Sequence, residues 1–154
     1  MPAEIAADRL AELVTRMLED AAFIFTEPSD PAPPFPTPVL EARLTFDGPG
    51  SGELALTTTP ALAQGLAANL LGLEPGDPET GRRAGDALGE FVNMLAGVVV
   101  LELFGPKAQT RIGVPEVREL AAAAASLGAT CASLATEDGE RIDARVSPSP
   151  QKAP

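Results

Sequence analysis

Residues 78–104 read PETGRRAGDALGEFVNMLAGVVVLELF, and this stretch predicts the long helix that organises the rest of the fold. At about 100° per residue, apolar side chains gather on one side of that helix, which is therefore expected to face the core. They include Ala84, Leu88, Phe91, Leu95 and Val98. The opposite side carries a polar stripe whose members are three or four positions apart. The polar stripe consists of Arg82, Asp86, Glu90, Asn93 and Gly97.

The polar stripe contains two residues that a helix interior disfavours. The Asn93 amide competes for backbone hydrogen bonds, and Gly97 costs about 1 kcal/mol relative to alanine. One explanation is a solvated face on which Gly85, Gly89 and Gly97 allow a neighbouring element to pack closely. The other is a docking face that presents a positioned carboxylate and amide, where glycine lets a partner's backbone approach. The residues of the stripe alone leave both explanations open.

Length and charge narrow the class of protein. The chain has 154 residues, 45% of them hydrophobic, which is enough for one domain with a proper core. Its net charge of −11 repels phosphate backbones and anionic lipid surfaces, and without Trp or Tyr it lacks stacking platforms for bases. We therefore expect neither a nucleic-acid-binding nor a membrane-binding protein.

Histidine and cysteine usage excludes several kinds of catalytic site. The sequence has no His, which removes histidine general bases and His-ligated metals, and its single Cys cannot form an internal disulfide. Cys131 is expected to be a small buried residue in a strand rather than a nucleophile. The N-terminus lacks the apolar core of a signal peptide and no run approaches transmembrane length, so we expect a cytoplasmic protein.

Helical and alternating patterns predict an α+β domain in which an antiparallel sheet packs against helices, including the long central helix. In chain order the expected elements are a helix over 4–20, a strand over 21–26, a proline-rich loop over 28–38, a hairpin of strands 40–46 and 53–58, a short helix that begins at Pro60 with Thr59 as N-cap and ends at Gly72 or Gly76, the long helix with Asp77 as cap, an extended segment over 107–117, and a hairpin of strands 130–136 and 140–146. Residues 117–127 are ambiguous, with an alanine run that favours helix. The domain is expected to span residues 1–147, followed by a disordered tail over 148–154.

Residues 86–97, DALGEFVNMLAG, carry a short motif within the long helix. The segment resembles the D/S-x-x-x-E-x-x-N signature of the chemotaxis phosphatase family that includes CheC, CheX and FliY, and it is most similar to CheX. Pro115 follows Asn93 with 21 residues between them, one fewer than in the family pattern. The resemblance implies a CheX/CheC-like, pseudo-symmetric domain.

The same resemblance implies hydrolysis of the aspartyl phosphate on a CheY-like response-regulator receiver domain, in chemotaxis or related two-component signalling. Asn93 would position the attacking water, and Glu90 would pair with a lysine beside the receiver's phosphorylation site. Asp86, Gly97 and Arg82 would be binding residues on the same face, Asp86 as a rim or capping contact. The chain would need no cofactor of its own because the receiver supplies Mg²⁺. By analogy with CheX relatives, a homodimer is also expected.

Two other functions stay open at this point. The same face would also suit a non-catalytic docking module for a receiver or for a flagellar or signalling partner. The other function, an independent metal-dependent hydrolase, agrees less well with the sequence, because the carboxylates are scattered and form no ligand cluster. A weaker copy of the motif occurs in the first helix as Asp8, Glu12 and Thr15. Its threonine is shorter than Asn and lacks the paired donor and acceptor, so we expect one active site per chain.

Overall fold

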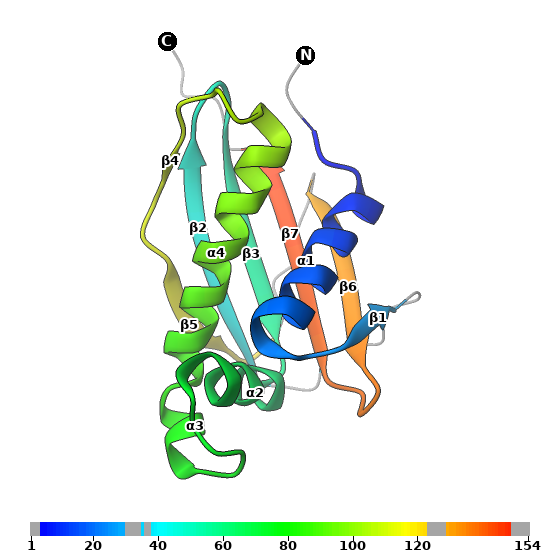
Figure 1. Cartoon of the computed structure of the whole chain (residues 1–154), viewed down its shortest axis with the longest axis vertical. Coiled ribbons are helices and arrows are strands. Elements are labelled where there is room, and N and C mark those ends of the chain that lie inside the picture. Colours follow the sequence, from blue (N-terminus) through cyan, green and yellow to red (C-terminus); the bar gives the residue numbers. More distant parts are fainter. Residues whose placement is uncertain (1–3, 30–34, 36–37, 123–128, 149–154) are drawn as a thin grey trace.

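A single antiparallel sheet forms one of the two layers of the molecule (Figure 1). The computed structural model describes residues 4–29, 35, 38–122 and 129–148. The strands lie in the order β1-β6-β7-β3-β2-β4, and β5 also pairs with β2. Their bounds are β1 Thr26–Pro28, β2 Val39–Asp47, β3 Ser51–Thr58, β4 Arg111–Ile112, β5 Glu116–Leu120, β6 Thr130–Thr136 and β7 Arg141–Pro148. The expected α+β class with an antiparallel sheet is confirmed.

The second layer consists of helices, with α1 and α4 side by side across one face of the sheet and α2 and α3 at its lower end in Figure 1. Their bounds are α1 Ala7–Ala22, α2 Pro60–Leu71, α3 Pro78–Arg82 and α4 Ala84–Phe104. α1 packs on β6, whereas α4 packs on β2 and against α2. The predicted N-terminal helix, central helix and two hairpins are all present.

The core lies between the two layers, where the β2–β3 hairpin directs its leucines toward the helices. In the β2–β3 hairpin, Leu44 is paired with Leu54 and Ala42 with Leu56, and all four are buried toward the helices. α4 supplies the largest share of the opposing surface, with nine of its residues buried: Ala84, Ala87, Leu88, Phe91, Val92, Leu95, Ala96, Val99 and Val100. Of the five positions expected to face the core, Val98 alone is only partly buried.

The predicted helix over 78–104 is in fact two helices. Asp77 caps the first as expected, its side chain accepting from the Glu79 N–H at 2.9 Å. The helical angles then break at Arg83, which has φ −101° and ψ 3°. Thr80, on α3, is buried, and α3 packs against α2. The break at Arg83 thus accompanies the packing of α3 against α2.

The segment 21–26 is not a strand, contrary to the prediction. α1 continues through Ala22, and Phe23 ends it in the left-handed region at φ 54°, with its N–H donating to the Glu19 carbonyl at 3.1 Å. β1 starts only at Thr26. This cap exposes Phe23 and Phe25 and turns Ile24 toward the core. The apolar run that suggested a strand is therefore a helix end and its exit.

Two further expectations need correction. The ambiguous stretch after 117 is strand β5 as far as Leu120, because it completes the sheet beside β2; the rest of its alanine run, at 123–128, lies outside the described residues. Cys131 is exposed rather than buried, since β6 turns its neighbour Ala132 into the core. The tail 149–154 and most of the proline-rich loop also fall outside the described part, and β7 extends through Pro148.

α4 is the one helix of the described chain that is long and apolar enough to cross a membrane by length and composition. The expectation that no run approaches transmembrane length is therefore wrong on those two criteria. Half of its most apolar window is buried inside the domain, however, against β2 and α2. The core helix of a soluble protein meets the same criteria, so α4 is explained by its packing.

Candidate functional site

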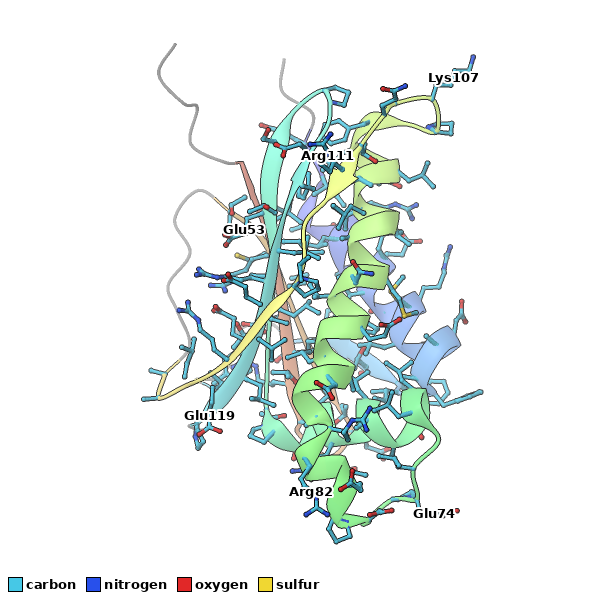
Figure 2. All side chains as sticks on the ribbon, turned by 90° about the vertical axis from the view of Figure 1, so that its left-hand side faces the viewer. Glu53, Glu74, Arg82, Lys107, Arg111 and Glu119 are labelled. Atoms are coloured by element: carbon cyan, nitrogen blue, oxygen red, sulfur yellow. The ribbon has the colours of Figure 1, made fainter. Side chains whose placement is uncertain are left out.

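The polar stripe of α4 lies on the solvent side, as helical spacing predicted. Asp86, Glu90, Asn93 and Gly97 are all exposed, whereas Leu88, Phe91 and Leu95 on the opposite side have no exposed surface. Because the buried side is packed in the core along most of its length, the exposed side is held on a rigid support. Arg82 is also exposed, but it belongs to α3 and lies at the lower end of the stripe (Figure 2).

Glu90 and Asn93 differ from the other charged and polar members of the stripe in having no partner. Within the described part of the chain, neither side chain makes a hydrogen bond or an ion pair. Asp86, by contrast, accepts from Arg83 Nε at 2.9 Å, and Arg82 pairs with Glu79. The structure therefore brings Glu90 and Asn93 together, one helical turn apart, as the two side chains available to an incoming molecule.

One flank of the stripe is formed by the start of β5 and the segment that joins it to β4. A methyl group on Gly89 would lie 3.3 Å from Val117 and 3.9 Å from Pro115, and one on Gly85 would lie 3.4 Å from Val117. Gly85 and Gly89 therefore let another part of the same chain pack closely against α4, which is the first of the two explanations considered for the glycines of this helix. A methyl group on Gly97 would meet no atom of the described residues within 4 Å. Internal packing therefore gives no reason for Gly97.

The other flank is α1, which is joined to α4 through an arginine. Arg9 donates to Glu102 and to Glu12, each at 3.0 Å, and Arg16 donates to Glu12 at 3.4 Å. The hydrogen bonds to Glu102 and Glu12 raise the pKa of Arg9, and the hydrogen bond from Arg9 lowers the pKa of Glu102 below its ordinary value. This link ties α1 to the C-terminal part of α4, and the sequence offered no sign of it.

The weaker copy of the motif on α1 is therefore arranged differently from the motif on α4. Its acidic residue, Glu12, is exposed but engaged by two arginines, and Thr15 is half-buried. Glu90 has no such partner. The two stripes share their spacing but differ in the availability of the carboxylate.

The site has few means of catalysis of its own. Among the described residues no group of three or more Cys, Asp or Glu side chains is placed to hold a metal ion. A depression between α2 and α3, lined by Gln64, Asn69 and Thr80 among others, contains neither Glu90 nor Asn93. The motif face offers an amide and a carboxylate on the exposed side of α4, which suits the positioning of a water or of a partner's groups.

A comparison with family models matches residues 41–137 to the family described as "Chemotaxis phosphatase CheX". The match includes the whole of α4, β5 and most of the sheet. No match is found among curated proteins.

Solved structures give the same likeness at the level of the fold. CheX from Desulfovibrio desulfuricans superposes with a TM-score of 0.67 at 19% identity, covering 93% of this chain and 98% of that one. CheX from Vibrio vulnificus gives 0.65 at 17% identity, covering 94% and 100%. A CheX–CheY–BeF3–Mg²⁺ complex from Borrelia burgdorferi gives 0.65 at 17% identity, covering 90% and 94%.

Proposed function

Because the chain belongs to the chemotaxis phosphatase CheX family, we propose that it hydrolyses the aspartyl phosphate of a CheY-like receiver domain. The observation that carries this proposal is the pair Glu90 and Asn93, exposed and without partners on a helix whose other side is fixed in the core. An ion pair or hydrogen bond within the chain would have to break before either side chain could bind a partner. Neither Glu90 nor Asn93 makes such an interaction within the described residues, so none has to break.

Asn93 is proposed to position the water that attacks the phosphorus. An acyl phosphate is already reactive, so a phosphatase gains most by holding water in line with the leaving carboxylate. The Asn93 amide can donate to and accept from that water at once. It also adds no negative charge beside the phosphoryl oxygens, as a carboxylate would.

Glu90 is proposed to bind a cation of the receiver. It lies one turn before Asn93 on the same face, so an ion pair at Glu90 would fix where Asn93 meets the phosphoryl group. A lysine beside the phosphorylated aspartate is the cation that the family resemblance implies. Asp86 and Arg82 are already paired within the chain, which suits weaker contacts at the rim.

The remaining parts of the proposal rest on the family rather than on geometry. The Borrelia relative is described in complex with CheY, BeF3 and Mg²⁺. We propose likewise that a metal ion reaches the site of this chain only on the receiver. A cytoplasmic location and a homodimer belong to the same proposal.

The test is release of phosphate from a phosphorylated receiver, with and without the chain. Wild type should accelerate the release of phosphate. Asn93→Ala should lower kcat by about 100-fold, the size of effect that the loss of one positioned donor has in other active sites. The affinity of this variant for the receiver should stay within about threefold of wild type. Gln64→Ala is the matched control, because it removes an exposed amide from another helix. Unchanged phosphate release by wild type, with the receiver still bound, would show a docking module instead of an enzyme.

A further inference from the structure

The exposed side of α4 continues past the polar stripe to Leu101. This residue follows Gly97 by four positions, as Gly97 follows Asn93, so helical geometry returns it to the same face. At about 100° per residue, Leu101 lies about 20° from Glu90 around the helix axis. Its side chain is 52% exposed, whereas Val100 before it is buried. Leu101 is therefore an apolar side chain in line with the two unpartnered residues of the site.

The exposed side of α4 thus changes in chemistry along the helix. Its N-terminal half carries Asp86, Glu90 and Asn93, which are charged or polar, and its C-terminal half carries Gly97 and Leu101, which are not. Helix formation does not require leucine at an exposed position, because glutamine, lysine, glutamate and arginine form helices about as well. Single exposed apolar residues are common on protein surfaces, so the case for Leu101 rests on its place in this line.

The neighbours of Leu101 leave it open to a partner. Glu102, the next residue, turns to α1 and pairs with Arg9 at 3.0 Å. On the side toward Asn93, Gly97 has no side chain, and a methyl group there would meet no atom of the described residues within 4 Å. A partner that reaches Asn93 can therefore approach α4 closely at Gly97 and continue to Leu101.

The distance is short enough for one partner to cover both residues. Leu101 is eight positions beyond Asn93, a rise of about 12 Å along the helix. A specific interface buries about 800 Å² on each partner, which equals a disc of about 16 Å radius. An interface of this size centred on Asn93 includes Leu101.

We propose, on the basis of the function proposed above, that the bound receiver extends along the C-terminal half of α4 and buries Leu101 against an apolar part of its surface. The receiver is the occupant because Leu101 continues the face that Glu90 and Asn93 present to it and lies within the area of one interface. In this arrangement the polar half of the face positions the receiver, and the apolar half adds affinity. Leu101 is then a binding contact for the protein substrate, not a catalytic residue.

The test is Leu101→Gln in the full chain. Titration calorimetry with a receiver carrying beryllium fluoride and Mg²⁺ measures Kd, and phosphate release at saturating receiver measures kcat. Glutamine keeps the length and helix propensity of leucine but loses its apolar surface. Because half of the leucine side chain remains to be buried, Kd should rise about fivefold, with kcat within twofold of wild type. Leu101→Met, which stays apolar, should keep Kd within twofold.

Leu71→Gln is the matched control. Leu71 is an exposed leucine at the last position of α2, so the same substitution removes apolar surface from another helix. Both Kd and kcat should remain those of wild type. A rise in Kd as large as that of Leu101→Gln would show that the effect is not specific to the face of α4 and would overturn the inference.

Failure of this inference differs from failure of the proposed function. If Asn93→Ala loses activity but Leu101→Gln has the Kd of wild type, the leucine contact is wrong and the phosphatase stands. If Leu101→Gln turns a dimer into a monomer in sedimentation while Kd is unchanged, Leu101 contacts a second copy of the chain and the inference is likewise wrong. If wild type neither binds nor dephosphorylates the receiver, both proposals fall.

Discussion

Glu90, Asp86 and Glu12 are three carboxylates at motif positions, and their surroundings differ. Asp86 pairs with Arg83 and Glu12 with Arg9 and Arg16, whereas Glu90 has no partner among the residues that the structure describes. Helical spacing predicted that Glu90 and Asp86 would be exposed. The pairs three and four residues apart can also be read from a helical sequence. Availability for binding, rather than spacing, is what sets Glu90 apart.

Gly97 provides a prediction in which stability and binding change in opposite directions. Gly97→Ala should raise the free energy of unfolding by about 1 kcal/mol, because the position is an exposed helix interior with nothing within 4 Å of the added methyl group. The same methyl should raise KM for the phosphorylated receiver if the partner's backbone approaches there. Urea unfolding and phosphate-release kinetics measure the two effects.

Gly65→Ala is the matched control for Gly97→Ala. Gly65 lies inside α2, and an added methyl would meet only Ile24 at 3.7 Å, an ordinary contact. It should give a similar gain in stability and leave KM unchanged. If Gly97→Ala stabilises the chain without raising KM, Gly97 is not at the interface.

At the scale of elements, β5 is held from both faces of the sheet. Val117 packs toward α4 against Gly85 and Gly89, and the next residue, Arg118, reaches the opposite face and pairs with Glu41 at 3.1 Å. Glu41 is nearly fully buried and also accepts from Arg145 of β7 at 3.0 Å. The strand that flanks the polar stripe is thus tied to the centre of the sheet.

Glu41→Gln tests whether the ion pairs of Glu41 hold β5 on the sheet. Removing the charge leaves two arginines facing a buried neutral amide, so the free energy of unfolding should fall by about 3 kcal/mol. Glu116→Gln is the control, since this carboxylate also pairs from β5 to β2 but is 76% exposed, and its loss should change stability by less than about 0.5 kcal/mol. Urea unfolding measures both. Equal, small effects from the two substitutions would mean that the buried pairs do not hold β5.

The elements that sequence predicted well are those whose own pattern specifies them. Strand β2 alternates from Ala42 to Asp47 and β3 returns beside it, β6 and β7 flank a turn at Asp138-Gly139, and the apolar side of α4 follows helical spacing. β1 and β5 were missed because short edge strands are defined by their pairing with β6 and β2, which no local pattern records. The break at Arg83 was missed for a related reason, since it depends on the packing of α3 against α2.

In the candidate site, the exposure of the polar stripe was predictable, and its surroundings were not. Periodicity alone placed Asp86, Glu90, Asn93 and Gly97 on one face. The Arg9–Glu102 pair joins positions far apart in the chain, and the place of Val117 beside Gly85 and Gly89 depends on how β5 docks against α4. Both require the tertiary arrangement, so neither left a signal in the sequence.

At the scale of the whole molecule, the two-layer arrangement places both helices that carry motif-like stripes on the same side of the sheet. α1 and α4 lie side by side in Figure 1 and are joined by Arg9 and Glu102. A second receiver on α1 would therefore sit beside the first, and it would find Glu12 already paired with Arg9 and Arg16. The fold and the ion pairs both favour a single receiver on each chain.

This single-site arrangement predicts the binding stoichiometry. Titration calorimetry with a receiver carrying beryllium fluoride and Mg²⁺ should give one receiver per chain. Glu12→Ala should keep that stoichiometry and leave phosphate release within about twofold of wild type, because it alters only exposed pairs on α1. Its free energy of unfolding should change by less than about 0.5 kcal/mol, for the same reason. A stoichiometry of two, reduced to one by Glu12→Ala, would instead show that α1 carries a second binding site whose arginines release Glu12 when a receiver docks.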